Sequence, residues 1–382
     1  MTDDPPPHPA LLPAGLCDLL PPEAEWEARA VGLVMDVFAA HGYQRVKPPL
    51  LEFADSLLAG SGAAVADQTF RVVDPESQRM LGLRADITPQ VARIAATRLA
   101  GAPRPLRLSY AGQCLRVHGG QIVPDRQVGQ VGIELIGSTS PAADAEIVVV
   151  GAEALARLGI ARASYDLTLP SLAPALIDAA GITGAERQAL AHALDRKDAA
   201  AVARHGGGGA LARILTELLL AAGPADGALA ALAAAALPPP ALALAEQLRE
   251  TVAAIRALAP DLRLTIDPIE FRGFRYHTGV CVTVYSPGRA EELGRGGRYL
   301  TAEQEPATGL TLFSDALLRT ASLPAPAPRV LLPAGADQAA AARLRAEGFA
   351  TLAALDETEA AAPRLGCTHV LRGGVAVPVG EA

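Results

Sequence analysis

The sequence reads Arg272-Gly273-Phe274-Arg275-Tyr276-His277-Thr278-Gly279 immediately before a strand-like segment, residues 280–285. A second strand-like segment follows and contains Gly294-Arg295-Gly296-Gly297-Arg298-Tyr299. An arginine, an aromatic ring and an imidazole thus lie within six residues, close to a run of glycines. Such a segment can bind a carboxylate and a flat polar ring while the backbone approaches closely. The pattern therefore indicates a segment that binds a small ligand with a carboxylate and a flat polar ring.

Composition limits the class of protein. A chain of 382 residues is long enough for two to three domains. Its net charge of −8 argues mildly against a nucleic-acid partner, because phosphate contacts need a basic face. The four cysteines are far apart and form no metal-binding pattern, so reduced thiols, no metal site and no cofactor are expected.

The ends and the apolar segments predict a cytoplasmic protein. Residues 1–9 are acidic and proline-rich, and they lack the cationic start and apolar core of a signal peptide. The longest apolar run, 228–245, is mainly alanine and is interrupted by Pro238-Pro239-Pro240. Alanine contributes little to membrane insertion, so no membrane association is expected.

Periodicity predicts an alternation of helices and short strands. Residues 23–41 form a helix, because Val31, Val34 and Phe38 recur at helical spacing. Residues 69–73 and 79–83 form a hairpin. Thr88 is expected to be the N-cap of a helix that runs to about residue 99. Strands are predicted at 105–113, 114–117, 128–137, 165–169, 262–270, 280–285 and 294–299, a helix at 142–158, and a strand that runs into a helix at 308–320.

One predicted strand has a polar face. Along residues 128–137, Val131, Ile133 and Leu135 alternate with Gln130 and Glu134. A polar face on an otherwise apolar central strand indicates the floor of a ligand site rather than a core. This strand and the segment at 272–279 are the two predicted parts of one pocket.

The chain is predicted to have two domains. Residues 1–322 form an α+β domain with an alanine- and leucine-rich helical insertion at 170–260. Residues 323–328, rich in proline and alanine, form a linker. Residues 329–382 alternate strand, helix, strand, helix and strand, which predicts a small α/β appendage.

The order of these motifs resembles histidyl-tRNA synthetases, from residue 13 to the linker. Residues 272–279 and 296–299 are similar to that family's histidine-binding segments. Residues 42–52 resemble motif 1 of class II synthetases, which builds the dimer interface, and Leu83-Arg84-Ala85-Asp86-Ile87-Thr88 resembles a further binding motif. Residues 115–134 resemble motif 2 and the strand after it. The resemblance implies an antiparallel class II synthetase-like sheet flanked by helices.

The same resemblance implies roles for individual residues toward histidine. Asp86, Thr88 and Gln130 match positions that bind the ammonium group, and Glu134 and Tyr276 match positions that bind the imidazole. A single residue of this kind is more often part of an ion pair or a polar strand face, but several matches in frame favour the binding role. The predicted histidine-binding residues are Asp86, Thr88, Arg116, Gln130, Glu134, Arg272, Tyr276 and His277.

Two of these residues carry separate expectations. Arg272 matches the residue that binds the histidine carboxylate, for which a guanidinium fork is well suited. His277 replaces a tyrosine of the family, and contact with the ligand or a half-buried strand position are equally expected.

Positions that serve adenylation in the family are altered. Activation of a carboxylate by ATP needs arginines on the phosphates and an acid for magnesium, because the transition state carries spread negative charge. Arg116 matches the motif 2 arginine, but His118 replaces the acid that follows it. In the motif 3 frame, Phe313 replaces a glycine and Ala316 replaces the arginine. Histidine binding is therefore expected to survive and aminoacylation to be lost.

The altered pattern resembles the regulatory subunits of ATP phosphoribosyltransferase, which keep the synthetase fold without aminoacylation. Residues 83–93, 194–198 and 276–279 match these subunits better than the synthetases. The resemblance implies a short-form catalytic subunit as partner, in an octamer of four plus four chains, histidine as feedback inhibitor, self-association through motif 1, and no tRNA. A diverged active histidyl-tRNA synthetase and a stand-alone histidine-binding interaction protein remain alternatives.

Overall fold

A computed structural model describes residues 11–120, 124–270, 276–286, 292–321, 326–355 and 358–380. The chain divides into two compact units, residues 1–322 and 323–382. Each unit is described by itself.

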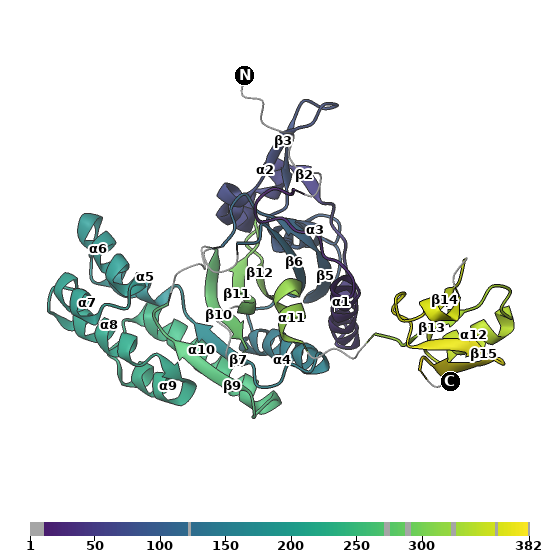
Figure 1. The fold of residues 1–382 in the computed structure, drawn as a ribbon. Helices are drawn as coiled ribbons and strands as arrows, with labels where there is room; N and C mark the ends of the chain where they lie inside the picture. The colour runs from purple at the N-terminus through teal and green to yellow at the C-terminus, as the bar shows by residue number, and fades with distance from the viewer. Residues whose placement is uncertain are drawn as a thin grey trace, which may run out of the picture. The chain divides into compact units, whose positions relative to one another are not determined.

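The first unit is built on a nine-stranded sheet, whose central strands are antiparallel (Figure 1). Two outer pairs, β1 with β5 and β7 with β9, are parallel. The predicted antiparallel sheet is thus confirmed. In spatial order the strands are β1 (Gln44–Arg45), β5 (Leu106–Leu115), β6 (Gln127–Ile136), β12 (Pro306–Phe313), β11 (Glu292–Leu300), β10 (His277–Tyr285), β7 (Ser164–Thr168), β9 (Arg263–Asp267) and β8 (Gly223–Pro224).

The structure has one strand where the sequence predicted two. Residues 105–113 and 114–117 were expected as separate strands, but β5 is continuous. Its pairing with β6 runs without a break from Leu106 opposite Ile136 to Leu115 opposite Gln127. The uninterrupted ladder satisfies the backbone groups across the predicted break.

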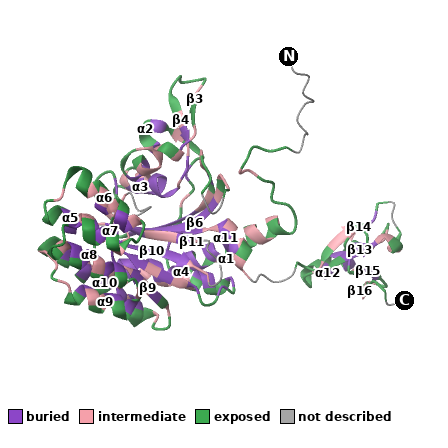
Figure 2. Cartoon of the chain, turned by 60° about the vertical axis from the view of Figure 1, so that its left-hand side comes forward, coloured by how far each residue is buried: buried purple, intermediate pink, exposed green. Residues whose placement is uncertain are grey.

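Helices cover one face of this sheet. Val34 and Phe38 are fully buried on the first helix, as their periodicity predicted. Contact with the sheet is close, because a Cβ on Gly151 would come within 2.2 Å of Leu310. Figure 2 shows the buried residues concentrated on the central strands and on the helix faces toward them. The covering helices are α1 (Glu23–Ala40), α4 (Pro141–Arg157), α10 (Pro239–Leu258) and α11 (Ser314–Thr320).

A smaller, three-stranded sheet precedes helix α3 in the sequence. Its hairpin, β3 with β4, was predicted and is confirmed, with Asp74 accepting hydrogen bonds from Ser77 at the turn. The order is β2-β4-β3. The elements of this part are β2 (Leu51–Phe53), α2 (Ala54–Leu57), the 3₁₀ segment η1 (Gly60–Gln68), β3 (Arg71–Val73), β4 (Met80–Leu83) and α3 (Thr88–Ala96).

The prediction that Thr88 caps α3 is wrong. Thr88 is the first helical residue, and the N-cap position, Ile87, makes no side-chain cap bond. The hydroxyl of Thr88 instead donates to the buried carboxylate of Glu134, at 2.9 Å. Asp86 accepts from the Thr88 backbone N–H, at 3.0 Å. The Thr88 hydroxyl therefore bonds to Glu134, far away in the sequence, and does not cap the helix.

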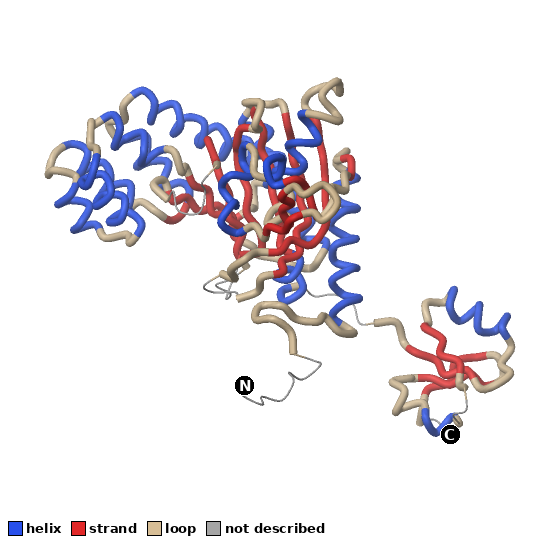
Figure 3. Tube along the Cα trace, turned by 90° about the horizontal axis from the view of Figure 1, so that it is seen from above, coloured by secondary structure: helices blue, strands red, loops and turns tan. Residues whose placement is uncertain are grey.

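The insertion forms a group of helices to one side of the sheet, next to β9 (Figures 1 and 3). The glycine-rich residues 206–209 connect two of its helices. In the part of the chain that the structure describes, no helix is both long and apolar enough to cross a membrane. The insertion helices before α10 are α5 (Leu172–Ala179), α6 (Gly184–Asp195), α7 (Ala199–His205), α8 (Ala210–Leu220) and α9 (Ala225–Ala234).

The second unit is a four-stranded mixed sheet with apolar clusters on both faces. One cluster contains Val330 and Leu344, and the other contains Leu331 and Val370. The predicted strands and helix are present, and a last strand, β16, was not predicted. The order is β14 (Ala350–Ala353), β13 (Arg329–Leu332), β15 (His369–Arg372) and β16 (Val375–Pro378), with α12 (Gln338–Ala346) and the 3₁₀ segment η2 (Glu359–Ala361).

Candidate functional site

A pocket opens on the sheet face opposite α4, where α3 begins. It has about 410 Å³ of space between its atoms, open solvent included. Strands β6, β12, β11 and β10 all contribute to it. The lining residues are Asp86, Thr88, Arg116, Gln130, Glu134, Tyr276, His277, Arg295, Gly296, Gly297, Tyr299, Gly309, Thr311 and Phe313.

The fold brings almost all of the predicted site residues to this one pocket. Seven of the eight, all except Arg272, line it. Arg272 lies outside the described residues, as do Phe274 and Arg275. Its role toward a carboxylate therefore stays a prediction.

The floor of the pocket lies where β12 places a glycine between β6 and β11. Gly309 on β12 lies opposite Glu134 on β6 and opposite Gly297 on β11. A Cβ on Gly309 would come within 2.0 Å of the Glu134 carboxylate. The glycine therefore leaves the space in which the carboxylate lies. This explains why the polar face of β6 opens into a pocket instead of packing in a core.

Glu134 is a fully buried carboxylate held by three hydroxyl groups. Thr88 Oγ1 and Tyr110 OH donate to Oε1 at 2.9 and 3.2 Å, and Tyr299 OH donates to Oε2 at 2.9 Å. Burial raises the pKa of Glu134 to about 8, although these hydrogen bonds act to lower it. The group can therefore accept or donate a hydrogen bond near neutral pH, as an imidazole ligand requires.

The structure adds residues that sequence reasoning missed. Tyr110, which lies beside Glu134, also makes a 2.7 Å bond with Thr311 Oγ1, and Thr311 lines the pocket. Tyr299 lies in the segment 296–299 that resembles a histidine-binding segment, but it was not among the predicted site residues. No local pattern marks Tyr110 or Thr311, because their partners are 24 and 201 residues away along the chain.

Tyr276 and His277 form a stacked pair at the pocket. Their ring centroids are 4.3 Å apart with 23° between the planes, and Tyr276 meets Tyr299 edge-on at 5.8 Å. Burial, and then the positive charge of Arg295, lower the pKa of His277 to about 3. The imidazole is thus neutral at physiological pH. His277 is at once the first residue of strand β10 and part of the pocket lining.

Two of the three residues expected near an ammonium group, Gln130 and Asp86, differ in the hydrogen-bond acceptors that they offer. Gln130 is buried, and its amide oxygen already accepts from Ile87 N at 3.0 Å and from Cys114 Sγ at 3.3 Å. Asp86 is half-buried and accepts from Thr88 N with one oxygen. The carboxylate of Asp86 is therefore the stronger acceptor for a cationic group.

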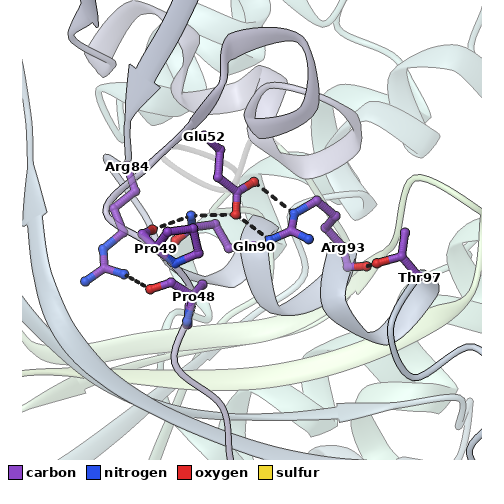
Figure 4. A network of polar contacts seen from close by, with 7 residues as sticks. All are labelled: Pro48, Pro49, Glu52, Arg84, Gln90, Arg93 and Thr97. Atoms are coloured by element: carbon purple, nitrogen blue, oxygen red, sulfur yellow. Dashed lines mark hydrogen bonds and ion pairs between the residues drawn. The ribbon is translucent and has the colours of Figure 1, made fainter. Parts of the chain in front are cut away.

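A polar network fixes the helix that brings Asp86 and Thr88 to the pocket (Figure 4). Glu52 accepts from Gln90 at 2.9 Å and from both ends of the Arg93 guanidinium, with Nε at 2.8 Å. Gln90 also donates to Pro49 O at 2.8 Å. These contacts tie α3 to β2 and to the segment before it, so the first turn of α3 has a defined position.

The adenylation positions are altered in space as well as in sequence. Arg116 lines the pocket, whereas His118 is exposed and is not among the lining residues. Phe313 lines the pocket with an aromatic ring where the synthetase frame has glycine. Ala316 is buried in α11 and presents no cation.

Comparisons with known proteins agree with this arrangement. Residues 15–317 match the histidyl-tRNA synthetase family. The chain is 55% identical over 376 residues to an ATP phosphoribosyltransferase regulatory subunit from Gluconobacter oxydans, with 98% of each chain covered. It is 53% identical to a protein of that name from Rhodospirillum centenum, again with 98% of each covered.

A solved structure has the same fold. The crystal structure of an ATP phosphoribosyltransferase regulatory subunit/histidyl-tRNA synthetase from Bacillus halodurans aligns with a TM-score of 0.81. The alignment covers 94% of this chain and 97% of that one at 22% identity, so it shows the fold alone. This chain therefore belongs to the histidyl-tRNA synthetase family, among the ATP phosphoribosyltransferase regulatory subunits, as its fold, the family match and more than 50% identity over 98% of its length show.

Proposed function

We propose that this chain is the non-catalytic regulatory subunit of an ATP phosphoribosyltransferase, and acts in the first step of histidine biosynthesis. Its near-full-length identity to proteins of that name supports this role. The non-catalytic role is supported by the contrast between two parts of the site. Three hydroxyl groups hold the Glu134 carboxyl group. In contrast, Phe313 and Ala316 occupy the positions at which the synthetase pattern has glycine and arginine.

The pocket is proposed to bind free histidine as the feedback signal. Asp86 and Thr88 would bind the ammonium group, with Gln130 beside them, and Glu134 and Tyr276 would bind the imidazole. A bound ligand that cannot be activated acts as a signal only if it binds one state of the complex better than another. A pocket that keeps its binding groups but has Ala316 in place of the motif 3 arginine suits this use. The full proposed set is Asp86, Thr88, Arg116, Gln130, Glu134, Arg272, Tyr276 and His277.

Self-association is proposed through the motif 1 region, residues 42–52, and the small sheet that follows it. Phe53, Leu81 and Val72 lie opposite one another across β2, β4 and β3, on one face. Phe53 is 36% exposed and Val72 is 47% exposed. A second copy would remove this apolar face from water. Residues 323–328 are proposed as a linker to a truncated α/β domain, with no role in tRNA binding.

Purification of the tagged chain from its own organism tests the proposed complex. A short ATP phosphoribosyltransferase chain is expected in equal amount, with a native mass of four plus four chains. The tagged chain alone is expected as a dimer. Histidine should inhibit the complex, and Glu134→Gln should abolish that inhibition without preventing assembly. Recovery of tRNA, of no partner, or of a Glu134→Gln complex that histidine still inhibits would contradict the proposal.

Loss of aminoacylation is tested by histidine-dependent ATP–pyrophosphate exchange. No exchange above background is expected, because removal of one well-placed charge stabiliser alone typically costs ~10²–10³ in rate. An authentic histidyl-tRNA synthetase in the same assay is the positive control. Exchange by the pure chain would instead favour a diverged, active synthetase.

A further inference from the structure

We propose that Arg295 binds the carboxylate of the amino-acid ligand and thereby makes the pocket selective for that group. This inference rests on the proposed binding of histidine. The sequence segment that contains Arg295 predicted only a close approach of backbone at its glycines, and the expected carboxylate ligand was Arg272. Arg272 lies outside the described residues, whereas the Arg295 side chain lies in the wall of the pocket.

Strand register determines where Arg295 lies. On β11 it is opposite Thr311 of β12, and Thr311 is opposite Gly132 of β6. In the next row, Gly309 separates Gly297 from Glu134. Arg295 thus lines the pocket from the β11 side, across the β12 floor from the carboxylate that β6 contributes.

The guanidinium of Arg295 is oriented before any ligand arrives. Glu292, three residues earlier on the same strand, accepts from Arg295 Nε at 2.9 Å and from Nη2. Both side chains are half-buried. An oriented guanidinium loses less side-chain entropy when it binds an anion, and a ligand carboxylate would approach the edge of its plane that does not face Glu292.

The charges of the pocket are distributed to suit a zwitterion. Asp86, which lies two residues before α3 begins, and the carboxyl group of Glu134 on β6 line the pocket, and Arg295 brings a positive charge to it from β11. Arg295 also lies close enough to His277 to contribute to the low pKa of that imidazole. A ligand ammonium group is attracted toward Asp86 and repelled by Arg295, so the α-carboxylate is the ligand group that fits beside Arg295.

A comparison of histidine with histidinol tests the contact between Arg295 and the ligand carboxylate. Histidinol keeps the imidazole and amine of histidine but has a hydroxymethyl group in place of the carboxylate. Calorimetric titration of the full chain with each ligand, at one pH, is expected to show tighter binding of histidine to the wild type. Arg295→Gln should weaken histidine binding about 10-fold to 100-fold, as for a charge-assisted hydrogen bond, and leave histidinol binding unchanged.

Two further variants complete the design. Arg295→Lys keeps the charge without the fork and should give an intermediate loss for histidine only. Arg249→Gln is the matched control, because Arg249 also pairs with a glutamate three residues earlier, Glu246, but on the exposed side of α10. Arg249→Gln should change the affinity for neither histidine nor histidinol.

The outcomes separate the inference from the proposed function. Equal losses for histidine and histidinol in Arg295→Gln, or no loss for either, would show that Arg295 does not hold the carboxylate. A wild-type chain that binds neither ligand would overturn the proposed histidine pocket and this inference with it. A loss confined to histidine supports both.

Discussion

Glu134→Gln is expected to remove a large pH-dependent part of the free energy of unfolding. In the folded chain the pKa of Glu134 is raised to about 8 by burial, from an ordinary value near 4.5. The folded state therefore keeps a proton that the unfolded state loses first. Stability from this group is complete below about pH 4.5 and decreases as pH rises to about 8.

The size of the effect follows from proton linkage. One group contributes a slope of up to about 1.4 kcal/mol per pH unit within that window. Urea unfolding of wild type and Glu134→Gln at several pH values between 5 and about 9 isolates the slope, because other titrating groups are common to both. The variant should gain stability relative to wild type as pH increases.

An exposed glutamate provides the control. Glu217→Gln removes a carboxylate from the surface of α8, where Glu217 lies 3.9 Å from Arg213. Its stability difference from wild type should stay nearly constant over the same range. A pH-independent difference for Glu134→Gln as well would mean that the buried carboxylate is already ionised in the folded chain.

Arg298→Met is expected to be among the most destabilising single substitutions, at about 3–5 kcal/mol. Arg298 donates to Asp144 through Nε at 3.1 Å, and Nη2 lies 3.0 Å from the other oxygen. It also donates to Ser138 O at 2.6 Å and to Ser140 O at 3.0 Å. The Arg298 and Asp144 side chains are only 7% and 3% exposed. The substitution therefore leaves a buried carboxylate without its counter-ion.

A double-mutant cycle measures this pair directly. Asp144→Asn in the Arg298→Met background removes the unpaired charge, so the double variant should lose less stability than the sum of the single losses. A coupling of about 1–3 kcal/mol is expected from urea unfolding. Arg249→Met, at an exposed pair, should cost less than about 1 kcal/mol. Additive losses at Arg298 and Asp144 would mean that the two groups do not interact in the folded chain.

The site shows where sequence reasoning succeeds. Alternation along residues 128–137 placed Gln130 and Glu134 on one face, and both line the pocket. Asp86, Thr88 and Tyr276 were located from short motifs, and they line it too. Side-chain alternation in a strand depends only on local geometry, so it can be read without knowledge of the partner strands.

Thr88 shows where the same reasoning fails. Its position before a proline and a helical pattern predicted an N-cap, which is a local hydrogen bond. In the structure its hydroxyl donates to Glu134, 46 residues further along the chain. A buried carboxylate without donors is costly, so its need for hydrogen bonds outweighs a capping bond that Asp86 can supply.

The sequence by itself determined the family, the mainly antiparallel sheet and the face of β6 that carries the polar residues. These depend on motif order and on local periodicity, which a single chain displays. Only the tertiary structure decided that Tyr110 and Thr311 join Tyr299 around the same site, and that Arg295 lies in its wall. The physical reason is that pairing register between strands distant in sequence sets which side chains meet, and no local pattern encodes it.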